Sequence, residues 1–258
     1  MPALADWSFV SLPLNVPVLP MNPMRKSCSH NIVAKGYAND DESDISGPKA
    51  NGKIGIQSKL SAKPQSAAIV LTHHTDIARS AITGRGVLLD WRRWALDNGI
   101  RYSPFESHAI PLEQLQAVAI EQNVTFRTGD ILLVRSGWTE EYRKLGERDK
   151  IALARRKDRR FVGVEASREM IKWHWDNGFA AVAGDTNAYE VWPPTKPDGV
   201  ALHEVFLSGW GMPIGEVWDL EALAACCNQL KRWTFFLSST PLNLEGGVAS
   251  PANAVAIS

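Results

Sequence analysis

Three side chains suited to binding a divalent metal lie close together in the stretch LTHHTDIAR, residues 71–79. His73 and His74 each offer an imidazole nitrogen and Asp76 offers a carboxylate, and zinc and manganese accept both kinds of ligand. A working site also needs these groups held at defined positions, which the spacing does not guarantee. The stretch is therefore a metal site, a fragment of one, or a chance cluster.

A second candidate pair is His203 and Glu216, one in ALHEVFLSGWG and the other in MPIGEVWDL. The chain between them contains glycine and proline, so it can turn and bring the two side chains together. An imidazole and a carboxylate again suit zinc or manganese, although two ligands do not complete a site. The other interpretation is a hydrogen-bonded histidine and a surface glutamate.

The remaining chemical signals are weak. His108, in SHAIPL, is a candidate pocket residue, and the alternative is a loop histidine satisfied by the backbone. The sequence contains no G-x-S-x-G elbow, Walker loop, G-x-G-x-x-G fingerprint or paired C-x-x-C motif, so serine hydrolases, P-loop enzymes and Rossmann oxidoreductases lose their main support. Apart from the candidate metal ligands, the sequence points to no residue with a catalytic role.

The elements that must position these residues alternate between helix and strand from about residue 100 onward. PLEQLQAVAIEQ has helical spacing of its apolar residues, and ASREMIKWHWDNG adds a capping Ser167 and a terminating Asn177-Gly178. Ile131 to Val134 and the stretch FAAVAGD are typical of short buried strands. RWTFFLSSTPL is rich in β-favouring residues and is predicted to be a central strand. The pattern predicts an α/β fold with a site at strand ends.

Composition favours an ordinary globular protein. Hydrophobic residues make up 45% of the chain, charged residues 22%, and the formal net charge is zero, so nothing favours nucleic acid as a partner. No apolar run is long enough to span a membrane. The first twenty residues lack a basic segment and are interrupted by prolines, so we expect no signal peptide and a cytoplasmic location.

A charged segment, TEEYRKLGERDKIALARRKDRR, runs from Thr139 to Arg160 and holds nine basic and five acidic side chains. It could bind phosphate, or it could be a solvated helix with pairs of opposite charge. We favour the solvated helix, because no basic excess elsewhere in the chain supports a nucleic-acid surface.

The segment from 43 to about 81 is atypical. The wider region 38–90 contains no Phe, Tyr or Trp, although the chain has ten tryptophans, and SDISGPKANGKIGIQSKLSAKPQS has the composition of a linker or disordered loop. A structureless loop of this length is unusual inside one domain. We therefore expect a single domain, 1–258, in which residues 43–81 are disordered or foreign to the fold.

Five stretches together resemble the cyclase family, which includes bacterial kynurenine formamidases and many fungal relatives. The resemblance covers about residues 82–258, with a weaker match near the start of the chain. The stretches are TGRGVLLDWRRWA, YSPFESHAIPLEQLQAVA, GDILLVRSGWTEEY, FVGVEASREMIKWHWDNGFAAVAGDTNAYE and LHEVFLSGWGMPIGEVWDLEAL.

The resemblance implies a metal-dependent hydrolase with a swivelling β/β/α fold, usually a homo-oligomer, acting on small amides or cyclic compounds. In that family Zn²⁺ or Mn²⁺ is held by an upstream motif, His-x-Gly-Thr-His-x-Asp-x-Pro-x-His or a fungal variant, and by a downstream His and Glu. The downstream pair falls on His203 and Glu216. The upstream motif is missing here, because Thr72 to Asp76 lacks its glycine, its proline and its last histidine.

Two functions follow from this resemblance. The first is a kynurenine formamidase-like hydrolase or cyclase that takes a small-molecule substrate, for which the many tryptophans suit an aromatic compound, with secondary metabolism as the family-level setting. The second is a non-catalytic family member that retains the fold as a binding or interaction protein, because two remaining ligands would hold a metal weakly.

Overall fold

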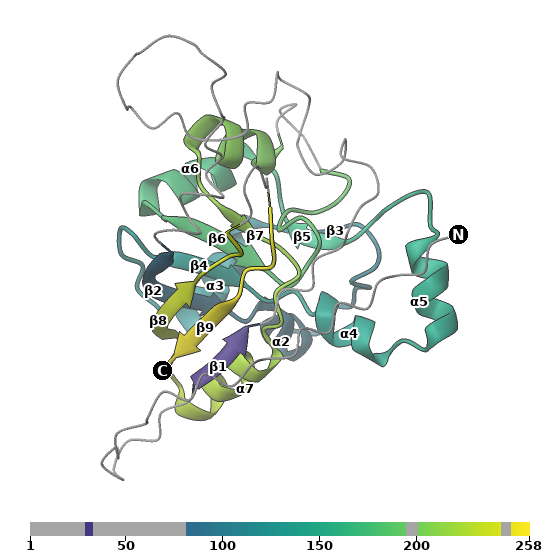
Figure 1. Ribbon diagram of the computed structural model, residues 1–258, viewed down its shortest axis with the longest axis horizontal. Helices are drawn as coiled ribbons and strands as arrows, with labels where there is room; N and C mark the ends of the chain where they lie inside the picture. Colours follow the sequence, from purple (N-terminus) through teal and green to yellow (C-terminus); the bar gives the residue numbers. More distant parts are fainter. Residues whose placement is uncertain (1–28, 33–80, 195–200, 244–248) are drawn as a thin grey trace.

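The computed structural model describes residues 29–32, 81–194, 201–243 and 249–258. In that part of the chain, a seven-stranded sheet runs through the molecule and two short strands form a smaller sheet beside it (Figure 1). Helices pack on the large sheet, so the predicted mixed α/β class is confirmed. The atypical segment 43–81 lies outside the described residues except for Ala81, and its nature stays a prediction.

The large sheet is parallel in one half and antiparallel in the other. Its order is β1-β9-β8-β2-β4-β6-β7. The parallel half consists of β2 (Ile82–Leu89), β4 (Ile131–Val134), β6 (Ala181–Gly184) and β7 (Ile214–Gly215). The antiparallel half consists of β8 (Thr234–Ser239), β9 (Ala254–Ile257) and β1 (Ser29–Ile32). The small sheet pairs β3 (His108–Ile110) with β5 (Val162–Val164) in parallel.

The central strands are apolar because both of their faces are covered. On β4, Leu132 and Val134 pack in the core cluster that includes α3 (Leu112–Glu121) and α6 (Arg168–Asn177). The alternate residues Ile131 and Leu133 pack in a second cluster with α7 (Glu221–Leu230). The two-residue period of a strand therefore sends successive side chains to opposite helical layers.

The helix ends follow the sequence signals. Ser167 precedes α6 and its side chain accepts a hydrogen bond from the Met170 amide, while Gly178 ends the helix with a φ of 64°. The remaining helices are α2 (Trp91–Asp97), capped by Asp90, then α4 (Trp138–Lys144), α5 (Glu147–Ala154) and the π-helix η1 (Glu204–Trp210). No helix among the described residues is long and apolar enough to cross a membrane.

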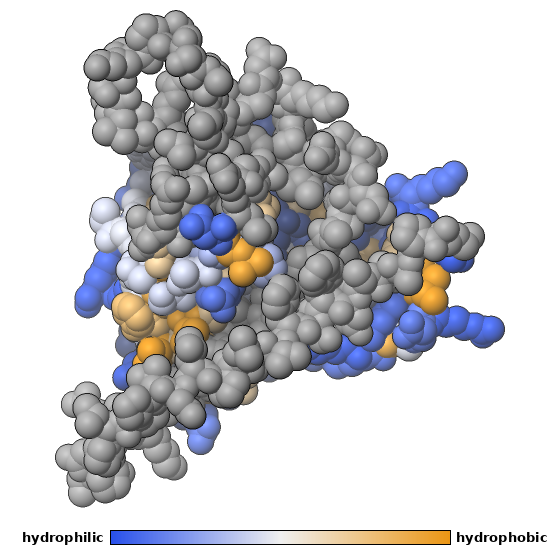
Figure 2. Space-filling model, in the orientation of Figure 1, coloured by the Kyte–Doolittle hydropathy of each residue, from blue (hydrophilic) through white to orange (hydrophobic). Residues whose placement is uncertain are grey.

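The strand predicted from RWTFFLSSTPL is β8, and it is an interior strand between β9 and β2. Only one of its faces is covered by the protein core. Phe235 and Leu237 are buried, whereas Phe236 is 51% exposed and pairs across the sheet with Ile257, which is 46% exposed. Figure 2 shows hydrophobic side chains gathered over this part of the sheet.

The charged segment forms α4 and α5. Lys144 contacts Glu140 at 2.7 Å and Glu141 at 2.8 Å, and α5 contributes no buried residue. Figure 2 shows hydrophilic side chains gathered over this end of the molecule. The arrangement matches the favoured interpretation, a solvated helical segment with pairs of opposite charge.

His174 lies fully inside the core on α6. Its Nδ1 is 2.8 Å from the carbonyl oxygen of Met170 and its Nε2 is 2.9 Å from the hydroxyl of Tyr189. Because a carbonyl only accepts, Nδ1 carries the hydrogen and Nε2 accepts from the tyrosine O–H. Burial lowers the pKa of His174 to about 4.

This lowered pKa predicts that the contribution of His174 to stability is lost in mild acid. The unfolded chain takes up a proton on this residue near pH 6.5 and the folded chain only near pH 4. The contribution of His174, complete above pH 6.5, should therefore fall as the pH drops toward 4, by about 1.4 kcal/mol per unit of pKa difference. Other groups titrate in the same range, so the quantity to measure is the difference in unfolding free energy between wild type and His174→Gln, from urea denaturation at several pH values. A difference that stays constant over this range would contradict the prediction.

Candidate functional site

The parallel strands end at one level. Leu89 of β2, Val134 of β4 and Gly184 of β6 are Cα partners, so the residues that follow them lie in a row at the carboxyl edge of the sheet. That row is Asp90, Arg135 and Asp185, and all three side chains are buried. The carboxyl edge of a parallel sheet is where α/β proteins place their ligands.

The charged side chains of this row form ion pairs and hydrogen bonds with one another and with nearby residues of the protein. Arg135 contacts Asp90 at 2.8 Å and Glu140 at 3.1 Å, and it also pairs with Glu221 on α7. Burial lowers the pKa of Arg135, but the hydrogen bond that it donates to Glu221 and the nearby negative charges outweigh burial and raise that pKa above its ordinary value. The pairs stabilise the edge of the sheet.

Asp185 ties the end of β6 to the end of β4. Its carboxylate accepts hydrogen bonds from the Ser136 amide at 2.6 Å, the Ser136 hydroxyl at 2.7 Å and the Gly137 amide at 2.7 Å. Burial raises the pKa of Asp185 to about 6, against the lowering effect of the hydrogen bonds from Ser136. This carboxylate therefore has a structural role at the edge.

The structure brings the predicted pair His203 and Glu216 into contact. His203 stands at the start of η1, Glu216 follows β7, and the distance from the imidazole Nε2 to the Glu216 Oε1 is 2.9 Å. The His203 side chain is 25% exposed and the Glu216 side chain 39%, so the pair can be reached from solvent. Metal binding by the two residues stays a prediction.

Sequence reasoning missed a third member, Glu190. Its Oε1 lies 2.7 Å from Nδ1 of His203, so the imidazole stands between two carboxylates. Burial lowers the pKa of His203, but Glu190 and Glu216 outweigh burial and raise it to about 9. The one signal for Glu190 in the sequence is an acidic residue within the largely apolar stretch AYEVW.

Backbone irregularities surround this group. Tyr189, directly before Glu190, has a φ of 60°, and Val217, directly after Glu216, has a φ of 54°. Positive φ is unfavourable for both residue types, most of all for a β-branched valine. The helix that follows His203 is a π-helix, a rare form that is frequent at functional sites. Strain of this kind persists where the surrounding structure enforces it.

The candidate His108 differs from its predicted environment. It belongs to strand β3, and its ring lies 5.1 Å from Tyr102 and 5.6 Å from Trp91, measured between centroids. Burial lowers its pKa, and its Nε2 has no hydrogen-bond partner among the described residues. The interpretation of a loop histidine satisfied by the backbone is therefore wrong. His73, His74 and Asp76 lie outside the described residues.

The donor chemistry of the His203 group fits a divalent metal as part of a site. An imidazole nitrogen and a carboxylate oxygen already in contact suit zinc or manganese, and a second carboxylate behind the imidazole is the usual support for a metal-binding histidine. No group of three or more potential ligands that could hold a metal occurs among the described residues. These residues therefore supply two ligands.

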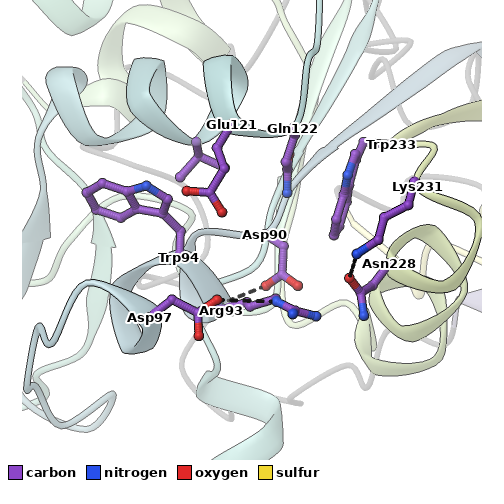
Figure 3. Close-up of a pocket in the computed structure, with 10 residues that line it drawn as sticks. Asp90, Arg93, Trp94, Asp97, Glu121, Gln122, Asn228, Lys231 and Trp233 are labelled. Carbon is purple, nitrogen blue, oxygen red and sulfur yellow. Dashed lines mark hydrogen bonds and ion pairs between the residues drawn. The ribbon is translucent and has the colours of Figure 1, made fainter.

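A separate cavity of about 140 Å³ lies between α2, α3 and α7 (Figure 3). Trp94 and Trp233 stand on either side of it and Asp90 lies between them. Its polar groups are engaged with one another, since Arg93 pairs with Asp97 and Lys231 donates to Asn228. The members of the His203 group do not line this cavity.

Gly163 gives a test of how the group is positioned. A Cβ at this residue of β5 would lie 2.2 Å from the carbonyl carbon of Glu190, so the backbones of the two segments could not stay this close. Gly163→Ala should cost more than about 3 kcal/mol of unfolding free energy, the upper range for overpacking.

The matched control for this variant is Gly146→Ala, whose Cβ would come no closer than 3.8 Å to a neighbouring side chain. Thermal and urea unfolding measure both proteins. Equal stability of the two variants would contradict the tight contact between β5 and Glu190.

Comparisons with known proteins bear on the fold and the family. A solved structure described as a novel cyclase is 30% identical, with a TM-score of 0.60, over 71% of this chain and 56% of that one. Isatin hydrolase A from Ralstonia solanacearum is 18% identical, with a TM-score of 0.50, over 76% of this chain and 65% of that one. The chain thus spans less than two thirds of the length of either. No curated protein matches the chain.

The family comparison covers more than half of the sequence. The model of the Cyclase family matches residues 46–191, a range that includes Glu190 and ends before His203 and Glu216. It also includes most of the atypical segment 43–81. The large sheet, the small sheet and the covering helices agree with the cyclase-like fold that the sequence predicted. The chain belongs to the cyclase family.

Proposed function

We propose that the chain is a metal-dependent hydrolase that acts on a C–N bond of a small amide or cyclic compound. The observation that carries the proposal is the contact between His203 Nε2 and Glu216 Oε1, with Glu190 behind the imidazole. Membership of the cyclase family and the position of the group at the carboxyl edge of a parallel sheet support it.

His203 and Glu216 would hold Zn²⁺ or Mn²⁺. When bound, such a metal supplies an activated water and polarises the carbonyl of an amide. The residues of this chain orient the two ligands: Glu190 fixes the imidazole, and the pairing of β6 with β7 places Glu216.

An aromatic substrate is part of the proposal. Phe206 and Trp210 lie on η1, directly after His203, and their rings are stacked with centroids 5.0 Å apart. Trp175 adds a third ring at 5.1 Å from Trp210, and it is 63% exposed. Phe206 is buried, Trp210 is partly exposed and Trp175 is exposed, so the last two would offer a flat aromatic compound a surface on which to stack. A homo-oligomer and a role in secondary metabolism are further parts of the proposal, and the family resemblance supports both.

A second candidate function is a non-catalytic binding or interaction protein. It is favoured by the number of ligands, because the described residues supply only two groups for a metal and a site of this size holds a metal weakly. The exposed pair Phe236 and Ile257 offers apolar surface of the kind that interaction sites use.

Metal analysis and turnover separate the two functions. Purified full-length protein is assayed for bound zinc and manganese and for hydrolysis of an aryl formamide and of isatin. The hydrolase should carry metal and turn over one of the substrates. His203→Ala and Glu216→Gln should lose most of both, because each removes a ligand.

The control is Glu113→Gln, which removes an exposed carboxylate on α3 far along the chain from the site and should leave metal and turnover unchanged. Monodisperse wild-type protein that binds no metal and shows no turnover supports the second function, a non-catalytic binding protein.

A further inference from the structure

We infer that Glu190 is a positioning residue, which fixes the hydrogen of His203 on Nδ1 and turns Nε2 toward Glu216. The inference rests on the proposed function for the identity of the ligand that Nε2 would meet, a divalent metal. The orientation of the imidazole itself does not depend on that function.

Three hydrogen bonds converge on the Glu190 carboxylate. Its Oε2 accepts from the Leu202 amide at 2.7 Å, and its Oε1 accepts from the His203 amide at 3.0 Å and from His203 Nδ1 at 2.7 Å. One oxygen thus holds both the backbone and the ring of His203. The same carboxylate satisfies two of the free N–H groups at the start of η1.

Glu190 is anchored so that it cannot follow a movement of the ring. Its side chain is 1% exposed, and its segment lies against β5 through a hydrogen bond of 2.9 Å from the Val164 amide to the Tyr189 carbonyl and another of 2.9 Å from the Val191 amide to the Val164 carbonyl. Gly163 leaves no space between the two backbones for a side chain. A rigid support is what an accurately placed ligand needs.

The two carboxylates fix where the hydrogens of the imidazole lie. A carboxylate only accepts, so Nδ1 donates to Glu190 and Nε2 donates to Glu216 while the ring carries both hydrogens. A metal would take the place of the hydrogen on Nε2, because Nδ1 stays bonded to the buried Glu190. A carboxylate that accepts from the second nitrogen of a metal-binding histidine sets its tautomer and raises its basicity as a ligand.

The strained backbone on both sides of the imidazole agrees with this role. Tyr189 holds a φ of 60° next to Glu190, and Val217 holds a φ of 54° next to Glu216. Strain at a site commonly accompanies groups that must be held in place for function.

The test compares Glu190→Leu, which removes the acceptor, with wild type and with the surface control Glu113→Gln, all as full-length protein. The first measurement is the imidazole Nδ1–H proton of His203 in metal-free protein by ¹H–¹⁵N NMR, assigned by its absence in His203→Gln. The second is the affinity for zinc in competition with a chelator. Glu190→Leu should lose the resonance and bind zinc about 10–100-fold more weakly, the usual effect of removing such a support, while the control changes neither.

The outcomes keep the inference separate from the proposed function. A resonance retained in Glu190→Leu, or zinc affinity equal to wild type, overturns the positioning role. Wild-type protein that shows the resonance yet binds no zinc overturns the proposed function, while loss of the resonance in the variant still supports the fixed imidazole. If Glu190→Leu fails to fold, Glu190→Asp keeps the charge one methylene further away and should show the same two losses to a smaller degree.

Discussion

Strands β2, β4 and β6 end at the same level, and this alignment places the polar residues that follow them side by side at the edge of the sheet. Asp90, Arg135 and Asp185 follow the paired residues Leu89, Val134 and Gly184, and all three are buried. Buried charged groups must be paired, and here they are paired with one another and with the turn after β4. The solvent-accessible pair of this edge, His203 and Glu216, lies at the start of η1 and directly after β7.

At that place the chain departs from regular structure several times within a short span. A π-helix begins after His203, and two residues with positive φ flank the carboxylates on either side of its ring. Each departure has an energetic cost, and each is held by neighbouring regular elements, namely β5 on one side and β6 on the other. The regular part of the fold stabilises the irregular part, which is the common relation between a scaffold and a site.

The sequence predicted the parts of this structure that depend on local patterns. Strand β4 and helix α6 have the expected bounds because burial on both faces and the Ser167 and Gly178 caps are local signals. His203 and Glu216 could be paired from the turn between them and from the family resemblance. Glu190 could not be predicted as a member of the group. The segment that carries it is placed by its pairing with β5, which lies far away in the sequence. The loop interpretation of His108 was wrong for the same reason, since its strand forms by pairing with β5.

The attachment of the two carboxylates has a consequence for folding. Glu190 lies on a segment that pairs with the small sheet, whereas Glu216 follows a strand of the large sheet, so the imidazole of His203 joins the two. The three residues can meet only after both sheets have formed and docked, a step that depends on contacts distant in sequence and is therefore slow. The imidazole and its two carboxylates are therefore expected to be among the last features of the fold to assemble.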